Sequence, residues 1–465
     1  MLLWVHWWNI VRQLRPAFSR NRSFLWFVVI VAGVSIRADN SGITSLVRGL
    51  GVSPRFYQRL LDNMHSFAIK VDTLAKIWLQ VVIRSFPTVR INGRLVLVGD
   101  GIKVGKEGRK MPAVKSLHQE SGSNSKPSWI MGHSFQALGI ISGTSGYFFS
   151  VPLIARIHEG IVRSNRDRRT LHDKLIAMLS TLGLTTSAYI ILDAYYSNQK
   201  IIKGLLLQGH HLISRMSKNS VAYFPAISPE KRRRGRPRKY GAKVRLADLF
   251  KTAKFSEAPS PVYGETGVNI LYYMVDLVWE PIGSLAHFVL VKHPTRGKCI
   301  FVSTDLELPA LDIIYAYGLR FKIEVSFKQA LHTLGTWSYH FWMKSMTPLR
   351  RGSGNQYLHR ETKQYRDKVA QKIHAYNTHV QAGLIAQGLM QYLAIHFTSE
   401  VWASFGSWLR TIRTNVLPSE QVVAKALRNQ FSRFIDEYQD ELELAKFLAE
   451  KQSPRTPLEK AYANG

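Results

Sequence analysis

The chain has little cysteine, few acidic residues and no long hydrophobic run, and each shortage excludes a class of protein. Its 465 residues include one cysteine, Cys299. A single cysteine excludes an internal disulfide framework and any zinc site built on paired cysteines. The composition therefore fits a protein of the reducing cytoplasm.

The one apolar stretch that could be mistaken for a membrane span is too short to cross a bilayer. It covers residues 24–36, or 13 residues, whereas a spanning helix needs about 20. A secretory signal is the alternative, since arginines precede the stretch. However, the leader is long, contains Trp4, Trp7 and Trp8, and lacks a convincing small-residue cleavage site. We expect a buried core helix here and no membrane partner.

Acidic residues are half as numerous as basic ones. The chain has 63 Lys and Arg against 31 Asp and Glu, a formal net charge of +32, and its 46% hydrophobic content is enough for a folded core. A surplus of this size repels itself in a compact protein, and binding a polyanion relieves the repulsion. Charge therefore favours nucleic acid as the partner, ahead of an anionic membrane surface.

The two ends of the chain have helical periodicity. In residues 1–90 apolar positions recur at helical spacing, and residues 42–57 have the pattern of two short helices around a glycine-rich turn. This pattern is typical of a helix-turn-helix DNA-binding unit, but it fits a plain helical packing domain equally well. Residues 350–465 form a second helical region.

The middle of the chain predicts a mixed α/β domain over residues 91–349. A short apolar run ends at Asp100, and a second one, residues 188–192, ends at Asp193. Strand-like and helical segments alternate around them, with helices expected near 170–182 and 198–208. In such sheets function lies at the carboxyl ends of the strands.

A basic, β-rich insertion interrupts this alternation at residues 218–305. Seven of the nine residues 231–239 are Lys or Arg, and residues 287–303 read as a hairpin. Residues 309–335 then predict a helix that breaks or kinks at Gly318.

Three acidic residues are candidate metal ligands: Asp100, Asp193 and Glu324. An aspartate that follows an apolar strand is more often a cap or turn residue than a ligand. On a helix Arg320, Glu324 and Lys328 share one face, where a surface ladder of ion pairs is the alternative.

Paired metal ions give a chemical reason for three such acids. Clustered carboxylates repel one another unless cations neutralise them. Two divalent ions, together with a phosphodiester, produce a neutral site that activates the attacking oxygen and stabilises the leaving one. Hard oxygen ligands suit two Mg²⁺ or Mn²⁺ ions rather than zinc.

The motifs around these acids resemble the DDE transposases of bacterial insertion sequences. The resemblance spans residues 91–349 and rests on Val98-Gly99-Asp100-Gly101, on residues 192–197 around Asp193, and on Tyr317-xx-Arg320-xxx-Glu324. The last motif is similar to the Tyr-Arg-Glu-Lys signature of one large branch, which also carries a β-rich insertion before the glutamate.

The resemblance implies a ribonuclease-H-like core in which Asp100, Asp193 and Glu324 bind metal. It also implies that Tyr317 and Arg320 hold the end of a DNA strand. The signature lysine is replaced by Leu331, and we expect Lys328, one turn earlier, to reach a phosphate instead. The absence of the signature lysine weakens the assignment to the Tyr-Arg-Glu-Lys branch but not the assignment to the DDE superfamily.

The basic segment is a second candidate DNA contact. Arg234, Arg236 and Arg238 resemble an AT-hook core, which enters the narrow minor groove of A·T-rich DNA. A basic loop that contacts phosphates without sequence preference is an equal alternative.

Several aromatic and histidine side chains have weaker functional interpretations. Trp279 could hold a flipped base, although core packing is the more common role for such a residue. Metal binding by His133, His210 or His211 is less expected than ordinary polar contacts.

The sequence as a whole predicts a DNA transposase with a helical DNA-binding N-terminus and a helical C-terminus. We expect it to bind the inverted-repeat ends of its own element as a homodimer, cleave them, join them to target DNA, and associate with the nucleoid. The alternatives are a non-catalytic DNA-binding protein, decayed or repurposed, and a metal-dependent structure-specific nuclease.

Overall fold

Five strands form the centre of one large mixed sheet in the computed structural model. It describes residues 2–40, 42–119, 127–144, 146–226, 238–406 and 414–453. The central order is β5-β4-β2-β7-β8, antiparallel from β5 to β2 and parallel from β2 to β8. This is the ribonuclease-H-like order, so the predicted fold class is confirmed. The strands are β2 (Arg94–Gly105), β4 (Trp129–Thr144), β5 (Tyr147–Ile157), β7 (Ala188–Leu192) and β8 (His211–Arg215).

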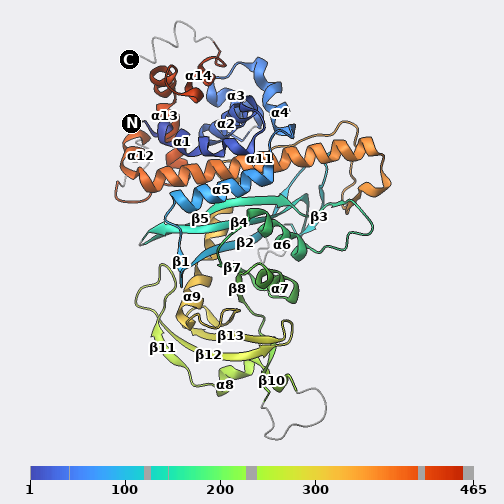
Figure 1. Ribbon diagram of the computed structural model, residues 1–465, viewed down its shortest axis with the longest axis vertical. Coiled ribbons are helices and arrows are strands. Elements are labelled where there is room, and N and C mark those ends of the chain that lie inside the picture. Colours follow the sequence, from blue (N-terminus) through green and yellow to red (C-terminus); the bar gives the residue numbers. More distant parts are fainter. Residues whose placement is uncertain are drawn as a thin grey trace.

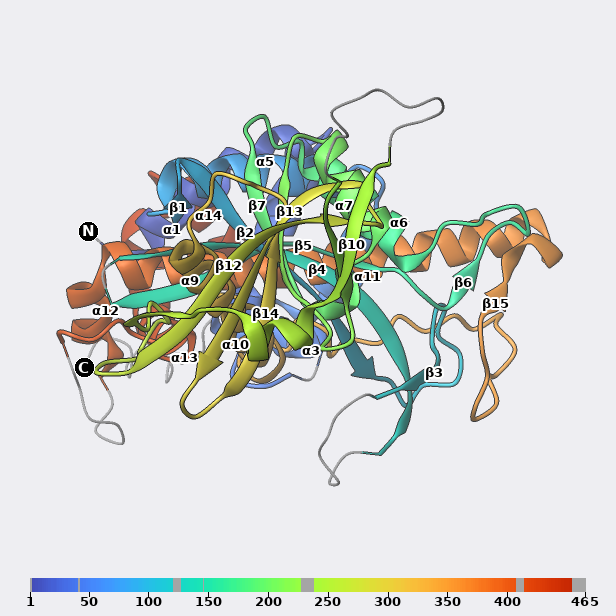
Figure 2. The same ribbon diagram turned by 90° about the horizontal axis from the view of Figure 1, so that it is seen from below.

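The β-rich insertion extends this sheet instead of forming a separate layer. Its strands continue from β8 in the order β14-β13-β12-β9-β10, and Figure 2 looks onto them. The predicted hairpin is confirmed, because β13 and β14 pair around a turn at residues 294–296. The elements of the insertion are β9 (Val221–Pro225), β10 (Tyr240–Arg245), α8 (Leu249–Thr252), β11 (Ser256–Pro259), β12 (Asn269–Trp279), β13 (Ser284–His293) and β14 (Gly297–Ser303).

Short helices cover both faces of the central strands. Two of them, α6 (Leu171–Leu182) and α7 (Gln199–Leu207), match the predicted ranges, and Thr170 and Asp173 form a capping box at the start of α6. The expected helix after the insertion is broken, as predicted, into α9 (Ala310–Gly318) and α10 (Phe321–His332). Short strands complete the core: β1 (Arg90–Ile91), β3 (Lys115–His118), β6 (Ile161–Val162) and β15 (Gln356–Tyr357).

The helical regions from the two ends of the chain pack together into one body on the sheet (Figure 1). The Trp4 indole donates to the Leu427 carbonyl at 2.8 Å, and Arg428 donates to the carbonyl of Ile36 at 2.8 Å. The helices of this body are α1 (Leu3–Val11), α2 (Asn21–Ile36), α3 (Ile43–Leu50), α4 (Tyr57–His65), α5 (Val71–Ser85), α11 (Lys363–His396), α12 (Thr398–Phe405), α13 (Glu420–Tyr438) and α14 (Glu443–Ala449).

The apolar stretch at residues 24–36 is a core helix, as predicted. It forms most of α2, and each of its side chains is buried among the other helices. Among the described residues, no helix is both long and apolar enough to span a bilayer.

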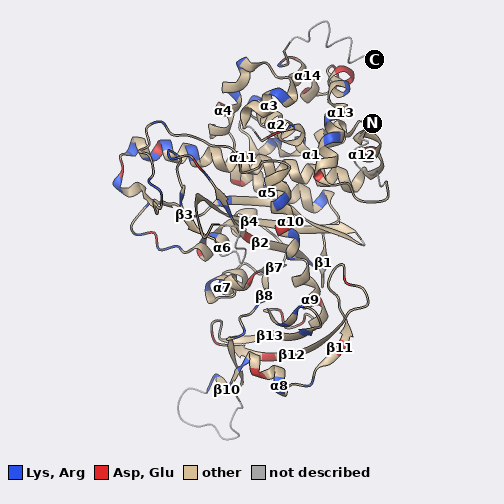
Figure 3. Cartoon of the chain, turned by 180° about the vertical axis from the view of Figure 1, so that it is seen from behind, with Lys and Arg blue, Asp and Glu red and all other residues tan. Residues whose placement is uncertain are grey.

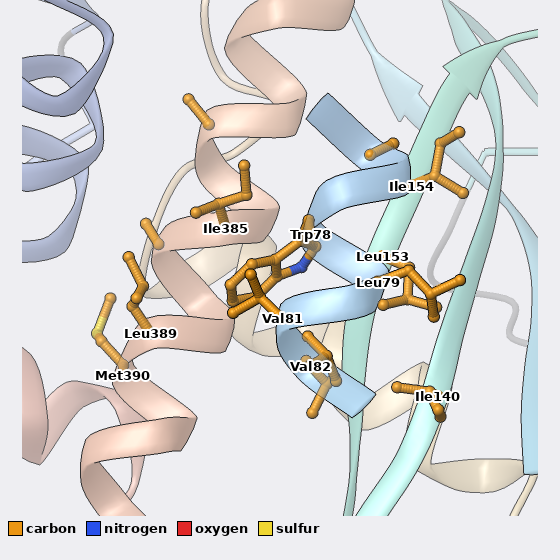
Figure 4. Packing of buried hydrophobic residues seen from close by; sticks show 14 of the residues in the cluster. Trp78, Leu79, Val81, Val82, Ile140, Leu153, Ile154, Ile385, Leu389 and Met390 are labelled. Carbon is orange, nitrogen blue, oxygen red and sulfur yellow. The ribbon is translucent and has the colours of Figure 1, made fainter. Parts of the chain in front are cut away.

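Helix α5 joins the helical body to the sheet, because it lies between α11 and the strands β4 and β5 (Figure 4). Its central residue is Trp78, which is fully buried and donates from Nε1 to the Pro152 carbonyl at 2.9 Å. On the facing side, Gly388 of α11 leaves room for the indole, since a Cβ there would overlap the Trp78 ring.

This contact predicts that Gly388→Ala destabilises the protein. At an open helical position the change from Gly to Ala stabilises by about 1 kcal/mol. Here the added methyl group overpacks the core. We expect the free energy of unfolding to fall by about 1–3 kcal/mol, measured as a lower midpoint of thermal unfolding. Gly354→Ala provides the control, because a Cβ at Gly354 would meet no atom within 4 Å. A midpoint that rises in Gly388→Ala would show that α5 and α11 do not pack in this way.

Candidate active site

The register of two parallel strands places Asp100 and Asp193 side by side. Val98 of β2 pairs with Ile191 of β7. Asp100 lies two residues further along β2, and Asp193 lies two residues past Ile191, in extended conformation just after β7 ends. Adjacent strands are about 4.8 Å apart, and residues i and i+2 share a face. Both aspartates therefore lie on the face of Val98 and Ile191, the face that α9 and α10 cover.

Local hydrogen bonds fix both carboxylates. Asp100 accepts from its neighbour, the backbone N–H of Gly101, at 2.7 Å. Asp193 caps a short 3₁₀ helix, Ala194–Tyr196, and accepts from the N–H of Tyr195 at 3.1 Å. The cap interpretation of Asp193 is thus correct, and it orients the carboxylate at the end of β7.

Arg320 connects the third acid to this pair. Its guanidinium donates to Asp100 Oδ2 at 3.0 Å and to Glu324 Oε1 at 2.6 Å. The Arg320–Glu324 contact is the i, i+4 pair expected on a helix, but the contact to Asp100 joins α10 to β2. The side chains of Arg320 and Asp100 are 17% and 22% exposed, so their ion pair is largely shielded from solvent, whereas Glu324 is 44% exposed.

Burial makes the charge on Asp100 costly. Desolvation raises the pKa of Asp100 from its ordinary value of 3.8 to about 6. The positive charge of Arg320 and the bond from Gly101 lower this pKa, while the nearby charge of Asp193 raises it. A perturbed carboxylate in a cleft is typical of a functional site.

The arrangement partly fits divalent metal ions. Asp100 and Asp193 offer adjacent hard oxygen donors, and a cation would relieve the repulsion between them. Glu324 is held on the other side of Arg320. Within the described residues no group of three or more His, Cys, Asp or Glu is placed to hold a metal ion. Arg320 contacts both Asp100 and Glu324 and thus lies between the glutamate and the first aspartate.

The other signature residues lie around this centre. Tyr317, at the end of α9, is partly buried against Phe301 with ring centroids 4.8 Å apart; burial raises its pKa, and Arg320 lowers it. Lys328 is exposed on α10. Leu331 is half-buried and packs against a cluster containing Ile102, so a packing role accounts for an apolar residue where the signature has lysine.

The basic segment lies mostly outside the described residues. Arg234 and Arg236 are not described, and Arg238 is exposed just before β10, at the far edge of the insertion.

The weaker candidates have structural roles. Trp279 is buried and packs against Phe288 at 6.1 Å, so core packing is its role. His133 is buried and bonds to the Pro112 carbonyl at 2.9 Å. His210 is buried, and His211 lies beside Thr304.

Sequence reasoning missed the residues that shape the cleft over the aspartates. The cleft has a volume of about 670 Å³, and Lys103, Trp129 and Tyr196 line it together with both acids. Gln136 of β4 donates to the Tyr196 hydroxyl at 2.7 Å, which holds that ring beneath the cleft. The tyrosine pair after Asp193 was the signal for Tyr196, whereas nothing in the sequence singled out Trp129.

The raised pKa predicts that Asp100→Asn stabilises the protein at neutral pH in metal-free buffer. Because the folded-state pKa lies above the unfolded one, the contribution of Asp100 to stability is complete below pH 4 and is lost as the pH rises through about 6. This pKa shift corresponds to a difference of about 3 kcal/mol at most in the free energy of unfolding. We expect denaturant unfolding to show this gain at pH 7 and little gain at pH 4.

Asp305→Asn is the matched control, with the opposite sign. Burial alone would raise the pKa of Asp305, but bonds from Tyr189 and Arg94, both 2.6 Å long, lower it overall. Its stabilising contribution is present at neutral pH and is lost as the pH falls, so Asp305→Asn should destabilise at pH 7. Destabilisation by both substitutions would contradict this account of Asp100.

Part of the chain matches a known protein family. Residues 155–260, which include Asp193, match the model of a family described as DDE superfamily endonuclease. No curated protein matches the chain. A solved structure, "Cryo-EM structure of piggyBac transposase synaptic complex with hairpin DNA (SNHP)", aligns over 94% of this chain and 78% of that one at 13% identity. The TM-score of this alignment is 0.34, and the strand order described above defines the fold. Over residues 155–260 the chain is similar to the DDE superfamily endonucleases, and the predicted resemblance is confirmed at that level.

Proposed function

We propose that this protein is a DNA transposase that cleaves the ends of its own insertion sequence and joins them to target DNA. One observation carries the proposal: the β2–β7 register aligns Asp100 and Asp193 under the helix that bears Glu324. The second aspartate also lies inside the DDE superfamily segment. Membership of the Tyr-Arg-Glu-Lys branch and of a bacterial element is part of the same proposal.

The three acids would hold two Mg²⁺ or Mn²⁺ ions. Such ions neutralise the phosphodiester and activate the attacking water or 3′-hydroxyl. Asp100 and Asp193 supply the fixed part of the site, because strand register and backbone bonds hold them in place. Glu324 stands one helical turn from Arg320 and completes the site when that arginine moves.

Arg320 has a double role in this proposal. Without DNA it is the counter-ion of Asp100 and Glu324. A phosphate at the cleft offers it a second anionic partner, and its planar guanidinium can bind that phosphate in bidentate geometry. Tyr317, packed beside it, would contact the same strand end, and Lys328 on the exposed face of α10 would reach a neighbouring phosphate.

DNA would also contact parts of the chain away from the cleft. The charge of +32 supplies affinity without sequence reading. Arg234, Arg236 and Arg238 belong to the segment between β9 and β10, which end the sheet on the side away from the helical body (Figure 1). This basic segment would contact DNA in the minor groove or along phosphates. We also propose that two copies act together on paired ends in the cytoplasm, at the nucleoid.

A structure-specific nuclease is the second candidate, because the family description names an endonuclease. It would share the carboxylates and the metal chemistry but would not join strands. Strand joining on labelled DNA separates the two functions.

Glu324→Gln tests the catalytic assignment. The change keeps the size of the side chain but removes one negative charge, so cleavage in Mg²⁺ should fall by orders of magnitude. DNA affinity should stay equal or rise slightly, since less negative charge faces the phosphates. Asp100→Asn and Asp193→Asn should behave alike, and their effects should not add, because the three residues serve one site.

The assay is end cleavage and strand joining beside a gel-shift titration. Glu307→Gln and Asp312→Asn are the controls, because they alter the next candidates for the third acid, and both variants should cleave like the wild type. Wild-type cleavage by Glu324→Gln would contradict the choice of the third acid. No cleavage by the wild type, with unchanged binding in all variants, would favour a non-catalytic DNA-binding protein.

The geometry of α3 and α4 agrees with a helix-turn-helix unit. Gly51 ends α3 in a left-handed conformation, and α4 follows after a short 3₁₀ turn. Arg55, in the 3₁₀ turn, and Arg59, in the first turn of α4, are both exposed. We propose that this end of α4 reads the element's terminal sequence, as recognition helices do.

Replacing Arg55 and Arg59 by Ala should weaken binding to the element's end more than binding to random DNA. A lost specific base contact costs about 1–3 kcal/mol of discrimination. Footprinting should use the full chain, because the N-terminal helices share their core with α11 and α13. Arg20→Ala with Arg22→Ala removes two exposed arginines from the same helical body and serves as the control. An equal loss on both DNAs would leave only a phosphate-binding role for α4.

A further inference from the structure

A second groove opens beside the cleft that holds the aspartates. It has a volume of about 1110 Å³ and lies between the segment after β2 and the segment before β15. Backbone hydrogen bonds join these two walls: Leu349 N–H donates to the Arg109 carbonyl, and Ser116 N–H donates to the Ser353 carbonyl, both at 2.7 Å. Backbone hydrogen bonds therefore hold the two walls of the groove at a fixed distance from each other.

One aromatic side chain stands where the groove meets the cleft. Trp129, at the start of β4, is 61% exposed and touches the ring of His118 edge-on at 5.0 Å between centroids. Trp129 and Ser116 line both the groove and the cleft of Asp100 and Asp193. The two hollows are therefore adjacent, and the indole forms part of the wall of both.

The groove is strongly basic. Arg109, Arg350 and Arg351 line it with exposed side chains, and Glu107 is the only carboxylate among its lining residues in the described part of the chain. Among those residues Arg350 and Arg351 form no ion pair with Asp or Glu, so both guanidinium groups are available to an anionic ligand. Lys and Arg also gather around the nearby N-terminal end of α11 and the loops beside β3 (Figure 3).

We propose that this groove binds an unpaired DNA strand that continues from the cut site, with one base stacked on Trp129. The proposal rests on the proposed function, because it places the reacting phosphodiester at Asp100 and Asp193. Stacking on an exposed indole needs an unpaired base, since neighbouring base pairs cover both faces of each base in a duplex. Arg350 and Arg351 bind the phosphates that follow, as in other grooves that track a single strand.

The test uses the full chain in metal-free buffer, so that no DNA is cut. The probes are a short blunt duplex and the same duplex with an oligothymidine extension, in which one base is a fluorescent adenine analogue whose emission falls on stacking. The wild type should prefer the extended duplex and quench the analogue. Trp129→Ala should lose that preference, with about tenfold weaker binding of the extension, and should not quench, while Trp129→Phe keeps both.

The arginines are tested with the same probes. Arg350→Ala with Arg351→Ala should weaken binding of the extended duplex and reduce its salt dependence by about one unit of slope per lost phosphate contact. Arg433→Ala with Lys446→Ala, which removes two exposed cations from α13 and α14, should leave the preference unchanged. Trp342→Ala is the aromatic control, because Trp342 is 56% exposed but does not line the groove.

Equal quenching and equal preference in Trp129→Ala and the wild type would overturn the proposal. So would an equal loss on the blunt and extended duplexes, since Trp129 would then not contact an unpaired base. Binding of an acidic peptide that depends on Arg350 and Arg351, without any preference for the extension, would assign the groove to a protein partner instead. A wild type that quenches the analogue but never cleaves DNA in Mg²⁺ would contradict the transposase proposal. The groove would then bind an unpaired strand that does not continue from a cut site.

Discussion

The parallel pairing of β2 with β7 is the constraint on which the rest of the site depends. Its register places Asp100 next to Asp193, and a slip by one residue would turn one carboxylate to the opposite face. This register requires the small Gly99, because a Cβ at that position would lie 2.7 Å from the Leu192 side chain and 2.9 Å from the Leu138 side chain. The strand therefore needs a glycine before its aspartate for close packing between strands, not for an unusual backbone angle.

Holding two carboxylates together is unfavourable, and the fold offsets this with one arginine. Arg320 lies at the break between α9 and α10, where its side chain can reach β2 while still contacting Glu324. Through these two contacts Arg320 connects Glu324 of α10 to Asp100 of the sheet. A ligand that competes for Asp100 or for Arg320 would loosen this tie, so binding and rearrangement of the site are coupled by charge.

The central part of the site could be predicted from the sequence, because its signals are local. The apolar runs before Asp100 and Asp193, and the spacing of Arg320 and Glu324, are visible in short windows of sequence. The expected end of the first strand at Asp100 was wrong, because β2 continues to Gly105 through its pairing with β4. The continuation of the sheet through the insertion depends on the pairing of β14 with β8, between residues nearly ninety positions apart, which no local pattern reveals. The joining of the N- and C-terminal helices, and the place of Trp129 beside the cleft, are non-local in the same way.

The most direct test of the account is anomalous diffraction from Mn²⁺ in crystals of the full chain bound to uncleaved DNA, with calcium-soaked crystals as the reference. The account predicts manganese peaks in contact with Asp100 and Asp193, with Glu324 released from Arg320 and the guanidinium turned to a phosphate. Manganese elsewhere on the protein, with Arg320 still bound to Asp100 and Glu324 while DNA fills the cleft, would contradict it.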